Sequence, residues 1–262
     1  METASLPILL RSLRLPAIGR QYQAISRTAM DQSWSHIQYF HALVETECQE
    51  RAGRRKQRLL HQSGLPEGKT MATLNLAKLP AKVGPIVGHL LNGHFVRQAR
   101  NALIFGLPGR GKTHLAAGIG RELIMRHAMS VCFTTTFNLV QKLLTAKAAL
   151  RVDRELAKLD KFDLVILDDL GYVQQSREEM EILFTFLAER YERKSLIITS
   201  NLVFSEWDRI FKDPMTTLAA IDRLVHHADV LELTGDSYRG EAAAAYLETL
   251  GAAQVAGTKL PP

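Results

Sequence analysis

The residues best suited to chemistry lie in one glycine-rich stretch near the middle of the 262-residue chain. Residues 106–113 read Gly-Leu-Pro-Gly-Arg-Gly-Lys-Thr, after the apolar run 102–105 and before apolar positions at 115–119 that are spaced for a helix. Gly106 and Gly111 permit backbone angles that a Cβ would forbid, so successive N–H groups can point into one concavity. A strand, a glycine loop and a helix in this order predict a phosphate-binding P-loop.

The loop and the first turn of its helix have defined roles around a nucleotide. The helix that begins near Lys112 adds unpaired N–H groups and the positive end of its dipole. Lys112 would reach the β- and γ-phosphates, and the Thr113 hydroxyl would ligate Mg²⁺. The alternative is a glycine-rich turn before an ordinary helix. We expect ATP and Mg²⁺ as cofactors, with nucleotide-binding residues Gly106, Leu107, Pro108, Gly109, Arg110, Gly111, Lys112, Thr113 and His114.

Two carboxylates follow a second apolar run. Residues 164–167 are apolar and are followed by Asp168 and Asp169. A buried strand that ends in two carboxylates costs free energy unless the charges are used. Asp168 is expected to hold Mg²⁺, directly or through water, and Asp169 to polarise the water that attacks the γ-phosphate. The alternative is a strand that ends in an acidic turn.

Asn201 and Arg223 complete the predicted hydrolytic site. Asn201 follows the apolar run 196–199, at the sheet edge where parallel α/β proteins bind ligands, and would orient the water or sense the γ-phosphate. Arg223 lies between apolar helix positions and suits an arginine finger that reaches into a neighbouring subunit's site. The alternatives are an asparagine that forms a turn or caps a helix, and an arginine in a surface ion pair.

Apolar runs and helical patterns alternate through residues 101–240. Because the strands are continuously apolar and the helices alternate with them, they predict a parallel sheet covered on both faces. The predicted strands are 102–105, 130–134, 164–167, 196–199 and 230–233. The predicted helices are 138–150, 153–159, 178–190 and 218–225, with a short polar helical stretch at 207–211.

The part before the P-loop is helical and basic. Residues 1–100 hold 14 lysines and arginines against 6 acidic residues, whereas the remainder holds 19 against 21. Such an arm favours a polyanion partner, and the alternative is a solvated face. We expect helices at 6–15, 17–30, 35–48 and 86–98. The expected domains are a helical domain at 1–66, a linker with one helix at 67–100, an ATPase core at 101–240 and a tail at 241–262. Candidate DNA contacts are Arg54, Arg55, Lys56, Arg58, Lys142, Lys147 and Arg151.

Composition excludes several classes of protein. With 46% hydrophobic and 23% charged residues the chain is an ordinary globular one. The two cysteines, Cys48 and Cys132, are too far apart in sequence to indicate a disulfide framework or a zinc site. Arg11, Pro16 and Arg20 interrupt the apolar N-terminal stretch, so we expect no targeting or membrane segment and a cytoplasmic protein.

Six stretches together resemble a known family. They read GLPGRGKTHLA, LVILDDLGY, RYERKSLIITSN, FSEW, IDRLVHHADVLEL and GDSYR. They resemble the AAA+ ATPases of the DnaA/DnaC group and, more closely, the IstB-like ATP-binding proteins of bacterial insertion sequences. The resemblance implies a three-layer α/β/α fold with a five-stranded parallel sheet. It also implies that the strand before Asn201 lies between the P-loop strand and the Asp168 strand.

The resemblance also implies a function. It implies ATP-dependent assembly on duplex DNA as a ring or helical homo-oligomer with weak sequence preference, bending of that DNA, and stimulation of a partner transposase. Arg223, in Ile-Asp-Arg-Leu, matches the arginine-finger position. Asp169 is one methylene shorter than the usual glutamate, so we expect hydrolysis to be slow and stimulated by DNA or the partner. Arg110 replaces a small residue. The 22 or so residues after Arg239 are too few for a full C-terminal lid, which leaves Arg239 a candidate sensor.

Three other functions share parts of these motifs. A DnaC-like replicative helicase loader has the same ATPase core, and would bind a helicase through its N-terminal segment. A small-molecule P-loop kinase would need an arginine-rich lid and an acceptor pocket, which the sequence does not show. A DNA scaffold that only locks on nucleotide would show a near-zero ATPase rate with and without DNA.

Overall fold

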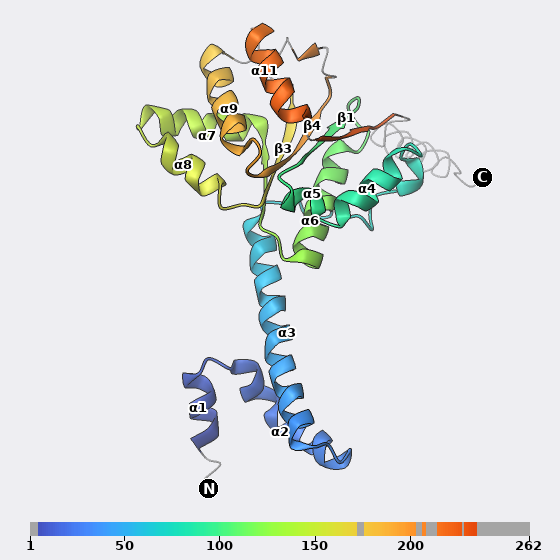
Figure 1. Cartoon of the computed structure of the whole chain (residues 1–262), viewed down its shortest axis with the longest axis vertical. Helices are drawn as coiled ribbons and strands as arrows, with labels where there is room; N and C mark the ends of the chain where they lie inside the picture. The colour runs from blue at the N-terminus through green and yellow to red at the C-terminus, as the bar shows by residue number, and fades with distance from the viewer. Residues whose placement is uncertain (1–4, 172–175, 203–205, 208–213, 227, 235–262) are drawn as a thin grey trace, which may run out of the picture. The chain divides into compact units, whose positions relative to one another are not determined.

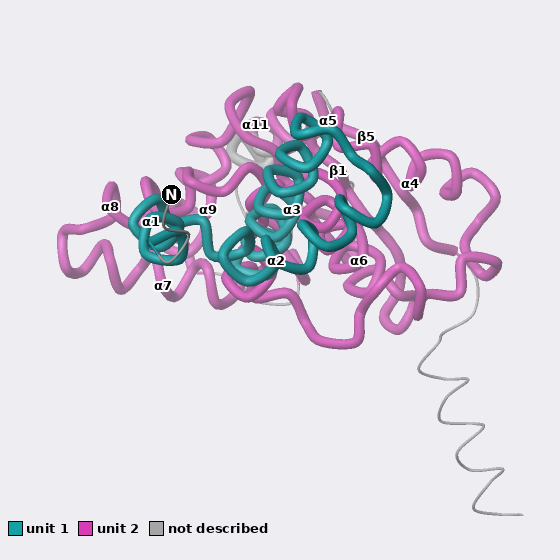
Figure 2. The backbone as a smooth tube through the Cα atoms, turned by 90° about the horizontal axis from the view of Figure 1, so that it is seen from below, with its two compact units in different colours: residues 1–58 teal, residues 59–262 magenta. Residues whose placement is uncertain are grey.

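The computed structural model describes residues 5–171, 176–202, 206–207, 214–226 and 228–234. The chain divides into two compact units, residues 1–58 (unit 1) and residues 59–262 (unit 2), which Figure 2 colours separately. No helix within the described ranges has the length and apolar composition needed to cross a membrane.

Unit 1 is helical, as predicted. It holds α1 (Leu6–Ser12), α2 (Pro16–Asp31) and the greater part of α3 (His36–Gln62). Pro16 occupies the first turn of α2, where a missing N–H costs nothing, so this proline begins a helix as well as ending the connection from α1. The expected helix at 35–48 was too short. The arginine, lysine and glutamine side chains that follow are good helix formers and continue α3 to Gln62.

Unit 2 is built on a five-stranded parallel sheet. Its strands are β1 (Asn101–Phe105), β2 (Val131–Thr135), β3 (Leu164–Leu170), β4 (Ser195–Ser200) and β5 (Ala228–Glu232). They pair in the order β2-β3-β4-β1-β5, and every pair is parallel. This order confirms the fold expected from the sequence, including the position of β4 between the P-loop strand β1 and the carboxylate strand β3.

Helices cover both faces of the sheet (Figure 1). On one face pack α7 (Thr136–Ala148), α8 (Val152–Leu159), α9 (Arg177–Arg190) and α11 (Pro214–Val225), and on the other α4 (Val83–Leu91), α5 (His94–Arg97) and α6 (Lys112–His127). Side chains alternate along β1: Leu103 and Phe105 belong to the first core cluster, Ala102 and Ile104 to the second. The three-layer arrangement places the ends of β1, β3 and β4 at one sheet edge.

The segment before β1 differs from the single helix expected at 86–98. It is broken into α4 and α5 at Gly93, which has φ 70°. A Cβ on Gly93 would lie 2.9 Å from Met129 Cε, so a glycine is needed there for both space and conformation. Upstream, residues 65–79 pack against the second core cluster of unit 2 and include a short 3₁₀ helix, η2 (Leu76–Lys78). Most of the helical stretch expected at 207–211, together with Arg239 and the tail, lies outside the described residues.

Candidate active site

The glycine loop joins β1 to α6 and requires glycine at three positions. Gly106, Gly109 and Gly111 have φ values of 152°, 83° and 84°. A Cβ on Gly106 would lie 2.6 Å from the carbonyl oxygen of Leu233, so the loop passes too close to the end of β5 for any side chain. The glycine-rich loop therefore has the backbone that a phosphate cradle needs, and α6 begins immediately after it at Lys112.

Lys112 is directed into its own loop. Its residue is 6% exposed, and its Nζ donates hydrogen bonds to the carbonyl oxygens of Gly106 (2.6 Å) and Leu107 (3.1 Å). These carbonyls are neutral acceptors, which a charged phosphate oxygen would replace with stronger, charge-assisted hydrogen bonds. The Lys112 ammonium is thus held beside the loop, where a phosphate would bind.

Asp168 is buried beside two hydroxyls, that of Thr113, which was expected to ligate a metal, and that of Thr199. β3 includes both carboxylates, as the sequence predicted, and continues one residue further to Leu170. Asp168 is 5% exposed, and Thr199 Oγ1 donates to its Oδ1 at 2.6 Å. The Thr113 hydroxyl also hydrogen-bonds to this carboxylate. Burial, together with the neighbouring Asp169 charge, raises the pKa of Asp168, although the hydrogen bonds from Thr199 and Thr113 and the positive charge of Lys69 oppose the rise.

Asp169 is turned toward the loop by an irregularity in β3. The pairing of β3 with β4 shifts register between Leu167 and Leu170, and Asp169 adopts φ 61°. Aspartate is among the few residue types that readily adopt a positive φ. The Asp169 N–H also donates to Thr199 Oγ1, on the neighbouring strand, at 2.9 Å. Thr199 therefore binds the carboxylate of Asp168 and the backbone N–H of Asp169. Sequence reasoning missed it, although Thr199 directly follows three apolar residues of β4 near the end that precedes Asn201.

One cavity of about 260 Å³ brings most of the predicted site together. The loop from Pro108 to His114, Asp169 and Asn201 line it, and so do three residues that the sequence reading did not single out. These are Lys69, Thr73 and Leu74. Asn201 Oδ1 is buried and accepts no hydrogen bond from the described residues. A buried amide oxygen without a donor is expected at a position that meets a ligand or a water.

Arg223 does not line this cavity. On α11, its Cζ lies 4.6 Å from the centroid of the Phe184 ring on α9, a cation–π contact within its own chain. Its Nη1 is buried and has no hydrogen-bond partner among the described residues. The position excludes Arg223 from the site of its own chain and leaves the expected role in a neighbouring subunit as a proposal.

The candidate DNA contacts are divided between the two units. Arg54 pairs with Glu47 and Glu50 in unit 1, and Lys142 pairs with Glu155 in unit 2. Lys56 is half-buried. The remaining four are exposed: Arg55, Arg58, Lys147 and Arg151.

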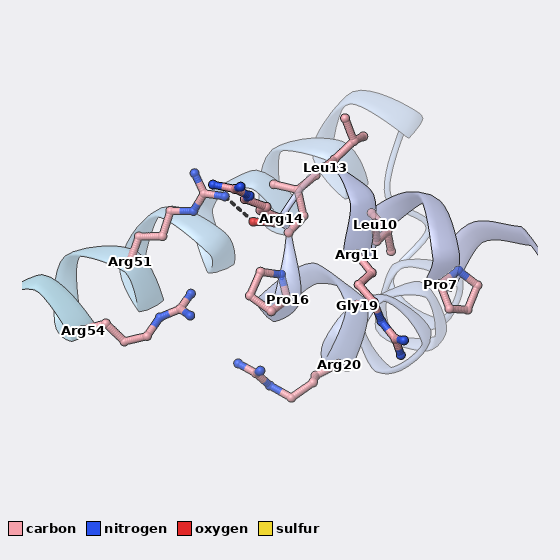
Figure 3. Close-up of a pocket in the computed structure, with 11 residues that line it drawn as sticks. Pro7, Leu10, Arg11, Leu13, Arg14, Pro16, Gly19, Arg20, Arg51 and Arg54 are labelled. Atoms are coloured by element: carbon pink, nitrogen blue, oxygen red, sulfur yellow. Dashed lines mark hydrogen bonds between the residues drawn. The ribbon is translucent and has the colours of Figure 1, made fainter.

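A second, larger cavity of about 750 Å³ lies within unit 1 (Figure 3). Arginines surround an apolar floor that includes Leu10 and Pro16. The arginines are Arg11, Arg14, Arg20, Arg51 and Arg54. Arg20 pairs with Glu50, and Arg51 donates to the Arg14 carbonyl and pairs with Glu47, so glutamates hold much of this cluster in place.

A protein-family model described as IstB-like ATP binding protein matches residues 8–244. The chain belongs to the IstB-like ATP-binding family. A Sinorhizobium fredii protein named for ATP binding in an insertion sequence is 42% identical over 93% of this chain and 82% of its own length. A protein named likewise from insertion sequence IS5376 of Geobacillus stearothermophilus is 34% identical over 87% of this chain and 90% of its own.

Solved structures resemble the IstB-like chain in fold. The DnaI structure superposes with a TM-score of 0.55 at 19% identity, covering 66% of this chain and 96% of that one. DnaA from Aquifex aeolicus bound to AMPPCP superposes with a TM-score of 0.56 at 17% identity, covering 72% of this chain and 57% of that one. These neighbours share the α/β fold of the chain, and family membership supports ATP as the ligand of the loop.

The donor set fits Mg²⁺. Magnesium prefers hard oxygen ligands, and beside ATP it uses one or two protein groups, the phosphates and water. The hydroxyl of Thr113 and the carboxylate of Asp168 touch one another next to the loop, so both would hold the ion, which would supply charge for the β- and γ-phosphate oxygens when bound.

Proposed function

We propose that this chain is a DNA-dependent AAA+ ATPase of an insertion sequence, which assembles on duplex DNA, bends it and stimulates a partner transposase. The observation that carries the ATPase part is the meeting of the P-loop, Asp169 and Asn201 in one cavity. Membership of the IstB-like family, and relatives named for insertion sequences, favour a transposase as partner.

The roles of the site residues follow from their positions. Lys112 and the loop N–H groups bind the phosphates, while Thr113 and Asp168 hold Mg²⁺. Asp169 accepts the proton of the attacking water, and Asn201 orients that water or senses the γ-phosphate. Burial raises the pKa of Asp168, and bound Mg²⁺ would oppose that rise, because a cation favours the charged carboxylate.

Assembly would complete this site. Arg223 is the proposed arginine finger, and it would serve the nucleotide of a neighbouring subunit in a ring or helical homo-oligomer. Leaving Phe184 would expose its charge for that contact. Exposed basic side chains such as Arg55 and Lys147 would contact DNA phosphates, with weak sequence preference and strong salt dependence.

A helicase loader of the DnaC type is the second candidate. The DnaC and DnaI structures share the fold of unit 2, at 18% and 19% identity. Likeness at this level concerns fold alone, whereas insertion-sequence relatives match at 42% and 34%. Binding assays of the full chain with a transposase and with a replicative helicase would separate these two functions.

Electron microscopy with ATP and duplex DNA tests the proposal. We expect wild-type protein to form ordered assemblies on DNA only with ATP, and Lys112→Ala to lose both ATP binding and assembly. Lys82→Ala is the matched control, because Lys82 is an exposed lysine outside the cavity. Wild-type protein that stays unassembled with ATP and DNA would contradict the assembly role, and ATP binding retained in Lys112→Ala would contradict the P-loop assignment.

A further inference from the structure

A short turn before α4 is fixed against the first turn of the P-loop helix. His114 Nε2 lies 2.9 Å from the Thr70 carbonyl oxygen and 3.0 Å from Thr73 Oγ1. Farther along α6, Met71 packs on Gly118, where even a Cβ would come within 2.8 Å of the Met71 sulfur. Two kinds of contact, polar and apolar, therefore fix this turn beside the nucleotide cavity.

The turn is also rigid in itself. Thr73 Oγ1 donates to the Gly68 carbonyl at 2.8 Å and accepts from the Thr70 N–H at 3.1 Å. Gly68 has φ 76°, which lets the chain reverse there without strain. A side chain carried on residues 68–73 is consequently held in a defined place, with little conformational entropy left to lose when it meets a ligand.

Lys69 is the cation that this turn carries, and it lines the cavity together with Lys112, Asp169 and Asn201. It is half-buried, and within the described part of the chain no carboxylate lies within ion-pair distance of its ammonium. Its charge reaches Asp168 only through space, where it favours the ionised carboxylate. A partly desolvated ammonium that faces a cavity without a close counter-ion favours an anionic ligand.

We propose that Lys69 binds the terminal phosphates of ATP, as a second lysine supplied from outside the P-loop. The inference rests on the proposed function only in taking ATP as the ligand of this cavity. Lys112 approaches the phosphates from the loop, while Lys69 approaches them from the turn at residues 68–73. Because Lys69 lines the cavity together with Asp169 and Asn201, the residues assigned to the attacking water, it is placed at the γ-phosphate end of the triphosphate and distinguishes ATP from ADP.

Nucleotide affinity of the full chain tests this role. Fluorescent analogues of ATP and ADP would be titrated, with Mg²⁺, into wild-type, Lys69→Ala, Lys69→Arg and Lys82→Ala protein. We expect Lys69→Ala to weaken ATP binding about tenfold or more, which is the effect of losing one charge-assisted hydrogen bond. The loss of ADP affinity should be several-fold smaller than the loss of ATP affinity. Lys69→Arg should recover part of the ATP affinity, and Lys82→Ala should match wild type.

Two outcomes would overturn the assignment. The first is an ATP affinity of Lys69→Ala within twofold of wild type. The second is an equal loss of affinity for ATP and ADP, which would indicate that Lys69 lines the cavity without contacting the γ-phosphate. Lys69→Met, which keeps the apolar stem, would replace Lys69→Ala if thermal unfolding showed the alanine variant to be unfolded. Wild-type ATP binding and DNA assembly stand as a separate measurement, so the proposed function can survive failure of this inference.

Discussion

The two units use buried charge in opposite ways. In unit 1, Glu47 is 4% exposed, accepts the N–H groups of Ala17 and Ile18, and pairs with Arg51 and Arg54, so helix α2 is joined to α3 by a charge that is fully used inside the protein. In unit 2, two carboxylates lie next to each other near a cavity that Lys69 and Lys112 also line. The difference indicates that charges in unit 1 support the fold, whereas those in unit 2 are arranged for a ligand.

The hydrophobic cores of the two units also differ, in how completely their residues are buried. Unit 2 packs helices on both faces of its sheet, and Leu103 and Ile166 are completely buried. In unit 1 the core residues Leu10, Ile18 and Leu43 each keep 7 to 8% exposure. A core this small contributes little free energy, so removal of one buried carboxylate that has four donors is expected to destabilise unit 1 strongly.

If unit 2 charges serve turnover, Arg223→Ala will have the largest effect. We expect a loss of about 10³-fold in DNA-stimulated ATP hydrolysis, the lower end for an arginine finger, with unchanged ATP affinity. Mixing Arg223→Ala with Asp169→Asn protein, which is expected to keep ATP-dependent assembly, should restore part of the activity, because some interfaces then pair an intact finger with an intact catalytic site. Absence of any recovery in a steady-state ATPase assay of the mixture would count against a finger acting in trans.

Asp169→Asn also tests whether the charges of unit 2 serve turnover. Asparagine tolerates the φ of 61° at this position, so the site should keep its shape and its ATP-dependent assembly on DNA. Removing the base should slow turnover at least about a hundredfold. Single-turnover hydrolysis and electron microscopy of the same sample measure the two effects, and loss of nucleotide binding would argue for a structural role instead.

Glu47→Ala tests whether the buried charge of unit 1 supports the fold. Removing a buried carboxylate from four donors is expected to lower the unfolding free energy of unit 1 by about 3 kcal/mol, whereas ATP affinity should stay near wild type. The two tryptophans lie in different units, Trp34 in unit 1 and Trp207 in unit 2, so urea unfolding of Trp207→Phe protein reports unit 1. Glu47→Gln is the matched control, with a smaller loss. A joint loss of ATP affinity would break the comparison.

The smallest effect is a pH dependence of unit 1. Burial alone would raise the pKa of Glu47, but hydrogen bonds from Arg51 and from the N–H groups of Ile18 and Ala17 outweigh it and hold the pKa below its ordinary value. A depressed carboxyl pKa contributes stability that is present above the unfolded-state value, about 4.3, and is lost as pH falls through the folded-state value. The stability gap between wild type and Glu47→Gln should therefore shrink below about pH 4 in the same Trp34 measurement.

The sequence was a good guide wherever a local pattern decides the structure. All five strands, the P-loop and the helices α6, α7 and α9 lie close to the predicted ranges, because apolar periodicity and glycine spacing act within a few residues. The order of the strands came from the family resemblance. Two boundaries were wrong: the end of α3 and the break at Gly93. The break depends on Met129, a neighbour that lies far away in the chain.

By itself, the sequence determined which side chains have the chemistry of a nucleotide site, since Gly106, Lys112, Thr113 and the two aspartates belong to short motifs. Tertiary structure alone decided how that chemistry is positioned. The Thr199 hydroxyl meets Asp168 and Asp169 only because β4 pairs with β3, and Lys69 reaches the cavity only because its turn is bound to His114 on α6. Partners about 30 and 44 residues apart in sequence leave no local pattern, and folding is what brings them together.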